Sequence, residues 1–133
     1  MNTDTEVVKQ FYSALNRNDV PAALELLDPQ IVRTEFEGTP TGGTYRGHQE
    51  LATHMAQGRS TWAEGSCSPD RYFVNGDKVV VDVHVHVRLK NETKWIDGRV
   101  GDAFALRDHL ITEFRSFLKL DQALSWAGID EKK

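Results

Sequence analysis

Residues 78–89 read KVVVDVHVHVRL, residues 94–106 read KWIDGRVGDAFAL and residues 110–118 read LITEFRSFL. Apolar and polar residues alternate across residues 79–89, so one face of this segment is buried and the other is not, as in an antiparallel strand. Short polar breaks at residues 91–93 and 108–109 separate the three segments. We therefore predict a meander of three strands joined by hairpins.

Length and composition indicate one domain. The chain has 133 residues and a formal net charge of −4, and its lysines and arginines are scattered, so we expect a single domain over residues 1–133 with no nucleic-acid partner. Its one cysteine, Cys67, excludes an internal disulfide and fits a reducing compartment. The polar N-terminus predicts no signal peptide and no membrane partner, and we expect a cytoplasmic protein.

Helical signals dominate the first half of the chain. Thr3 and Glu6 have the spacing of a capping box, and apolar residues at helical spacing follow, namely Val8, Phe11, Tyr12 and Leu15. We predict three further helices. These are residues 22–27, capped by Asp19 and stopped by Asp28-Pro29; residues 48–57, ended by Gly58; and residues 122–127, capped by Asp121.

Strand and loop signals complete the pattern. Residues 31–36 can form a strand, after which Gly38, Pro40, Gly42 and Gly43 indicate a loop. Residues 62–67 read as an irregular strand, and residues 71–74 form a strand before a turn at 75–77. This order predicts an α+β fold in which helices cover one face of an antiparallel sheet.

Three segments carry a family resemblance. They are VKQFYSALNRNDVPAALELL at 8–27, YRGHQEL at 45–51 and FALRDHLITEFRSFL at 104–118. Together they resemble the nuclear-transport-factor-2-like superfamily, within it the SnoaL-like and ketosteroid-isomerase-like branches. The resemblance implies a curved antiparallel sheet wrapped around the long first helix, forming a cone with an apolar pocket, usually in a homodimer. Members include isomerases, cyclases, epoxide hydrolases, dehydratases and non-catalytic domains, so the fold does not decide the function.

Asp102 is the leading candidate for chemistry. If Phe104 and Leu106 point into the core, the period of two places Asp102 on the same face, among apolar neighbours. Burial there would raise the pKa of the carboxyl and suit it to proton transfer. The segment VGDAFAL at 100–106 also resembles the isomerase segment that holds the acid facing the substrate oxyanion. The alternative is a partly solvated acid at a strand start.

Other positions depart from the patterns that the resemblance implies. The oxyanion tyrosine aligns with Phe11, with Tyr12 about 100° away on an ideal helix. The catalytic base aligns with Thr34, while Glu35 is expected on the opposite face unless a bulge intervenes. A supporting tyrosine aligns with Met55. We therefore do not expect steroid isomerase activity.

The epoxide-hydrolase pattern also lacks its parts. The later of its two acids aligns with Ser116 and its arginine with Val80. We keep Ser116 and His54 beside Asp102 as candidate catalytic residues. The candidate ligand-binding residues are Tyr12, Thr34, Phe36, Met55, Trp62, Tyr72, Phe104, Phe114 and Leu118.

Asp82, His84, His86 and Arg88 share one face of the predicted strand. Two imidazoles about 7 Å apart on a strand can bind metal. Against this, no third histidine is assured nearby, so we favour a polar outer face and predict no metal and no organic cofactor. That face is also expected to pair two copies into a homodimer that weakens towards pH 5, as histidines acquire charge.

Three functions remain open from the sequence. The first is a cyclase- or isomerase-type enzyme acting on a small apolar carbonyl compound, with Asp102 moving the proton and Ser116, Thr34, Tyr12 or His54 holding the oxygen. The second is a non-catalytic domain that binds an apolar small molecule. The third is a dimeric scaffold whose sheet face is the functional surface.

Overall fold

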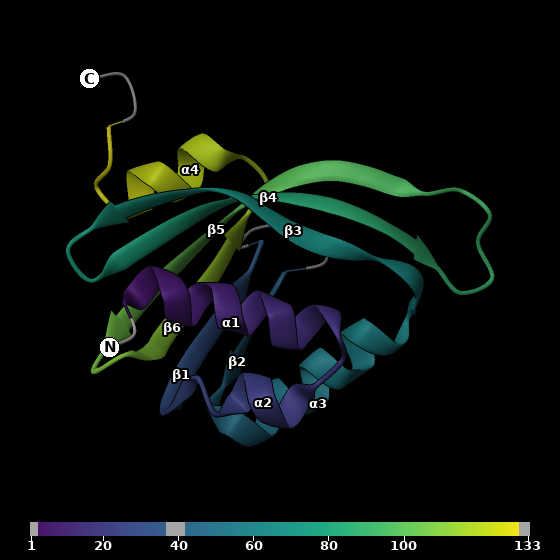
Figure 1. Cartoon of the computed structure of the whole chain (residues 1–133), viewed down its shortest axis with the longest axis horizontal. Helices are drawn as coiled ribbons and strands as arrows, with labels where there is room; N and C mark the ends of the chain where they lie inside the picture. The colour runs from purple at the N-terminus through teal and green to yellow at the C-terminus, as the bar shows by residue number, and fades with distance from the viewer. Residues whose placement is uncertain (1–2, 37–41, 131–133) are drawn as a thin grey trace.

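The computed structural model describes residues 3–36 and 42–130. They form four helices and six strands that build a single sheet (Figure 1). The helices are α1 (Asp4–Asn16), α2 (Val20–Leu24), α3 (Gly47–Ser60) and α4 (Leu120–Trp126). The strands are β1 (Leu27–Glu35), β2 (Gly43–Arg46), β3 (Trp62–Asn75), β4 (Lys78–Leu89), β5 (Ile96–Arg107) and β6 (Leu110–Phe117).

The predicted meander is confirmed, and the whole sheet has the order β2-β1-β6-β5-β4-β3. Asp108 and His109 both have positive φ, at 54° and 64°, which matches the twist that a two-residue hairpin turn needs. One expectation is corrected, because β1 runs parallel to β6 and the sheet is therefore mixed. β1 thus lies between β2, with which it pairs in antiparallel fashion, and β6, with which it pairs in parallel.

The first helix covers the inner face of the sheet. Thr3 Oγ1 accepts a hydrogen bond from the backbone N–H of Glu6 at 3.1 Å, which confirms the predicted helix start. Val8 and Phe11 are almost fully buried against valines of β4 and against Phe104 of β5. This core holds the long helix across the sheet (Figure 1).

Helices cover both faces of the sheet, not one. Figure 1 shows α4 on the opposite side of the sheet from α1. There Ala123 and Leu124 pack on Val80 and Ala103, the residues of β4 and β5 that point away from α1. Two consecutive apolar residues, Val79 and Val80, are therefore both buried, one on each face.

Several predicted boundaries move. The second helix is shorter, Val20–Leu24, and β1 begins at Leu27 and continues through Pro29, where its pairing with β6 is irregular and a proline costs little. The third helix runs through Gly58 to Ser60, and the fourth begins after Lys119 rather than Asp121.

Two loop predictions also change. Gly43 belongs to β2, which pairs with β1, whereas the predicted loop positions Gly38 and Pro40 lie outside the described residues. Residues 62–75 form one strand, β3, at the sheet edge, where Pro69 is tolerated beside a register shift. No helix in residues 3–36 or 42–130 has both the length and the apolar character needed to cross a membrane.

Candidate active site

A cavity of about 490 Å³ lies between the inner face of the sheet and the helices α1 and α3. This volume falls in the range of sites that hold small organic molecules. Its apolar lining comprises Phe11, Leu15, Phe36, Met55, Trp62, Val83, Val85, Ile96, Val100 and Phe114. Its polar and sulfur-bearing lining comprises Tyr12, Arg33, Glu35, His54, Arg59, Cys67, Arg99, Asp102 and Ser116.

Two elements, α1 and β6, each bring a hydroxyl group to the Asp102 carboxyl on β5. Tyr12 of α1 donates its hydroxyl to Asp102 Oδ2 at 2.5 Å, and Ser116 of β6 donates its hydroxyl to Asp102 Oδ1 at 2.6 Å. Asp102 and Ser116 are register partners on β5 and β6, so the strand pairing itself holds them together. All three side chains are buried.

Burial controls the protonation of this group. It raises the pKa of Asp102, while the charge of Arg33 and the hydrogen bonds from Ser116 and Tyr12 oppose that rise. Burial and the neighbouring Asp102 carboxylate raise the pKa of the Tyr12 hydroxyl well above its usual value. Tyr12 is therefore a proton-bearing donor at neutral pH, and Asp102 holds a proton more readily than an exposed carboxyl does.

Arg33 links this carboxyl to the rest of the polar lining. Its Nη2 donates to Ser116 Oγ at 2.9 Å, and its guanidinium lies over the Phe114 ring, 3.8 Å from the centroid. Burial lowers the pKa of the Arg33 guanidinium, but arginine remains charged in proteins. The Ser116 hydroxyl therefore separates the Arg33 guanidinium from the Asp102 carboxyl. The positive charge of Arg33 offsets only part of the effect of burial on the pKa of Asp102.

Glu35 and His54 form the other end of the network. Glu35 Oε1 contacts Nε2 of His54 and lies 3.8 Å from Nη2 of Arg33. The His54 imidazole stacks on the Tyr45 ring at 3.8 Å between centroids, with an interplanar angle of 14°. Position and orientation of this imidazole are thus set by a carboxylate on one atom and an aromatic ring on one face.

These contacts form a continuous chain of polar groups along the cavity wall. It runs through Tyr12, Asp102, Ser116, Arg33, Glu35 and His54. Exposure increases along it, from 5% for Asp102 to 28% for the His54 side chain. The chain therefore joins a buried carboxyl to a partly solvated imidazole, and both ends line the same apolar cavity.

Most residues predicted from the sequence line this cavity. They are Asp102, Ser116, His54, Tyr12, Phe36, Met55, Trp62 and Phe114. The other four lie elsewhere. Thr34 shares the outer face with Arg115, its register partner; Phe104 is fully buried in the core; Tyr72 packs at the edge of the core; and Leu118 is 58% exposed.

Glu35 corrects the expected orientation of β1. It was expected to face away from the pocket, but it lines the cavity, as does Arg33, while Thr34 does not. Ile31 is fully buried in the core beneath α1, so the period of two from Ile31 gives Arg33 and Glu35 the inward positions. That signal was present in the sequence and would have found both residues.

A family model described as the SnoaL-like domain matches residues 8–114. The chain belongs to this family. A comparison with curated proteins gave no significant match.

Solved structures resemble this SnoaL-like domain over nearly its whole length. A nuclear-transport-factor-2-like protein of unknown function from Burkholderia pseudomallei is 22% identical, with a TM-score of 0.78 over 94% of this chain and 97% of that one. TerC, co-crystallised with polyporic acid, is 19% identical, with a TM-score of 0.77 over 94% and 98%. An epoxide hydrolase from M. tuberculosis is 18% identical, with a TM-score of 0.73 over 92% and 86%. At these identities the likeness establishes the fold alone.

One cluster of potential metal ligands occurs in the described part of the domain. It consists of His84, His86 and Asp97, on the outer face of the sheet and outside the cavity.

Proposed function

We propose that this SnoaL-like domain is an enzyme that catalyses proton transfer on an apolar carbonyl compound, in an isomerisation or cyclisation. The observation that carries the proposal is the Asp102 carboxyl, buried in an apolar cavity and contacted by two hydroxyl groups. Burial raises the pKa of this carboxyl, so it holds a proton at higher pH than an exposed carboxyl does and can deliver it to a ligand in the cavity.

The roles of the other groups follow from their places in the network. With Asp102 protonated, its O–H can donate to Tyr12, which frees the Tyr12 O–H to bind the carbonyl oxygen of a ligand. The Glu35–His54 pair accepts the proton from the carbon next to that carbonyl, and Glu35 stabilises the imidazolium formed. Return of the proton to a different carbon completes an isomerisation. In a cyclisation the enolate carbon attacks a second carbonyl carbon, and the alkoxide formed there takes the proton back from the imidazolium.

Exchange of hydrogen for deuterium tests this proposal without knowledge of the natural substrate. The protein is incubated in D₂O with a panel of mono- and bicyclic aliphatic ketones, and deuterium uptake next to the carbonyl is followed by mass spectrometry. We expect uptake from at least one ketone well above the rate with heat-denatured protein. Ketones that alter the fluorescence of Trp62, which lines the cavity, yet take up no deuterium would identify a binding domain instead.

We also propose that the chain forms a homodimer through the outer face of its sheet. Trp95, which stacks on His86 at the outer face of the sheet, is 43% exposed. Pairing about a two-fold axis would remove this apolar surface from water. Sedimentation velocity at micromolar concentration should give twice the mass of the chain, and a Trp95→Glu variant should sediment as a monomer. A monomeric parent protein would refute the assembly.

The expected weakening of that dimer at low pH is not retained. Asp97 Oδ1 lies 2.5 Å from Nε2 of His84 and 3.7 Å from Nδ1 of His86. Its carboxylate therefore offsets part of the positive charge that the two imidazoles would gain. The repulsion between charged imidazoles of the two copies, which was expected to weaken the dimer at low pH, is therefore reduced by a carboxylate in each copy.

A further inference from the structure

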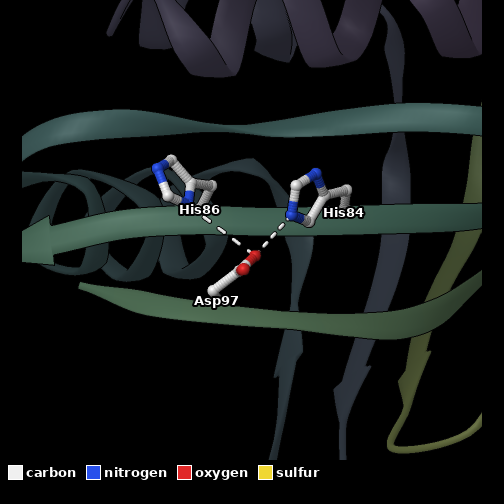
Figure 2. A group of neighbouring side chains, drawn as sticks. All are labelled: His84, His86 and Asp97. Carbon is white, nitrogen blue, oxygen red and sulfur yellow. Dashed lines mark hydrogen bonds and ion pairs between the residues drawn. The ribbon is translucent and has the colours of Figure 1, made fainter.

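We infer that His84, His86 and Asp97 form a binding site for a divalent transition-metal ion of the Zn²⁺ type. The three side chains converge on the outer face of the sheet, and Figure 2 shows both imidazoles turned towards the Asp97 carboxylate. One ligand atom from each lies within 4.8 Å of the others. The site is separate from the cavity, because Val83 and Val85, which alternate with the histidines, point to the other face and line it.

Strand geometry presents the ligands together. His84 and His86 are two residues apart on β4, so both project from the same face, with ring centroids 5.9 Å apart. Asp97 is the register partner of His86 on β5, which brings its carboxylate alongside. Because the hydrogen-bonded ladder between β4 and β5 fixes all three Cα positions, little order would have to be gained on binding.

The distances between ligand atoms suit a small metal ion. Ligands about 2.0–2.1 Å from a tetrahedral ion stand roughly 3.4 Å from one another. Asp97 Oδ1 lies 2.5 Å from His84 Nε2 and 3.7 Å from His86 Nδ1. Rotation of the Asp97 side chain away from His84 and towards His86 would bring these two distances nearer to that spacing. Two imidazole nitrogens with a carboxylate oxygen suit Zn²⁺, Cu²⁺ or Ni²⁺.

The neighbouring side chains leave room for the ion. On the β3 side, His86 is paired with Ser66 and His84 with Ser68, both small and neutral. On the β5 side, His84 is paired with Arg99, whose Nη1 is 2.7 Å from Asp70 and 3.4 Å from Asp82. That cation is engaged by two carboxylates, so it opposes metal binding less than a free arginine would. In the single chain the side chains of His84, His86 and Asp97 are 37%, 49% and 63% exposed, so a fourth coordination position is accessible there.

A stacked indole orders one of the ligands. The Trp95 ring lies on the His86 imidazole, with centroids 4.4 Å apart and an interplanar angle of 13°. The stack restricts rotation of the ring and leaves its nitrogens at the edge, where a metal ion would bind. It also places a fluorophore beside the proposed ion.

The other histidines lack this arrangement. His48 Nε2 contacts the backbone carbonyl of Leu27, His54 is engaged by Glu35, and His109 Nδ1 lies 3.5 Å from Asp4. None of them belongs to a group of three potential ligands in the described part of the chain. His109, an exposed histidine near a single carboxylate, therefore supplies a matched control.

Calorimetric titration of the tag-free full chain with ZnCl₂ tests the site. We expect saturable binding of one ion per chain, whether or not two copies pair. His84→Ala and His86→Ala should each weaken the affinity at least tenfold, since even partners of metal ligands are worth about 10–100-fold. His109→Ala should bind as the parent does. Binding without saturation, or equal affinity in His86→Ala and the parent, would overturn the inference.

Two further readouts separate a true site from surface binding. Zinc should raise the Tm of the parent and of His109→Ala by a few degrees, but not that of His86→Ala, because only the folded state holds the three ligands together. One equivalent of Cu²⁺ should quench the fluorescence of Trp95, and this quench should disappear in Trp95→Phe while Zn²⁺ binding persists. An equal quench in Trp95→Phe would place the ion elsewhere.

Discussion

Replacement of Asp102 by asparagine is expected to lower the deuterium-exchange rate by about 10²–10⁴-fold, the usual contribution of a general acid or base. The amide preserves the shape of the carboxyl but carries no titrating proton. Tyr12 and Ser116 would still have a partner at this position. Binding of the ketone, read from Trp62 fluorescence, should therefore change much less than the rate. The comparison requires kcat and KM measured separately for parent and variant.

The pH dependence of stability supplies the folding control for this variant. Burial raises the folded-state pKa of Asp102 above its unfolded value of about 3.9. The stability contributed by protonation is therefore fully present below that value and is lost as pH rises through the folded-state pKa. Asparagine cannot ionise, so Asp102→Asn should gain stability relative to the parent as pH rises.

Asp121→Asn, on the exposed first turn of α4, is the matched control and should show no comparable rise. A variant of Asp102 that folds and exchanges deuterium as fast as the parent would remove Asp102 from the mechanism. Loss of exchange together with loss of ketone binding would instead indicate that Asp102 shapes the cavity.

Gly65→Ala is expected to reduce the free energy of unfolding by about 3 kcal/mol or more. Gly65 has φ of +117°, a conformation that side chains with a Cβ rarely adopt. A Cβ there would lie 2.2 Å from the backbone oxygen of His86 and 2.6 Å from Cα of Val87. Backbone atoms cannot rotate aside, so β3 and β4 would have to separate locally. Urea denaturation followed by circular dichroism measures the loss.

Gly98→Ala gives the contrasting case in the same sheet. Gly98 lies on β5, its φ is outside the left-handed region, and nothing lies within 4 Å of the position its Cβ would take. Its replacement should be neutral or stabilise by up to about 1 kcal/mol, through a less flexible unfolded chain. If both variants unfolded at the same urea concentration, the close approach of β3 to β4 at Gly65 would be contradicted.

The proposed chemistry uses other residues than the ketosteroid-isomerase pattern or the epoxide-hydrolase pattern of the wider superfamily. Val80, at the position of the epoxide-hydrolase arginine, is buried beneath α4 on the face away from the cavity. Ser116, at the position of an acid, serves instead as the link between Asp102 and Arg33. The acid–base groups that line this cavity are Asp102 and the Glu35–His54 pair, which is why the proposal rests on them.

The sequence by itself determined the elements whose signals are local. A capping residue and helical spacing define α1, and the alternation of valines with polar residues defines β4. The same period of two relates Asp102 to Phe104, so the inward position of this carboxyl could be predicted without knowledge of its partners. Such signals depend on neighbours within a few residues, which any single sequence displays.

Only the tertiary structure decided which side chains meet. Arg33 meets Ser116 and Phe114 because β1 pairs in parallel with β6, which sets Arg33 opposite Phe114 and Glu35 opposite Ser116. Asp97 meets His84 and His86 through the register of β5 on β4. Contacts between strands far apart in the chain depend on how the whole sheet closes over α1, and local periodicity carries no information about that closure.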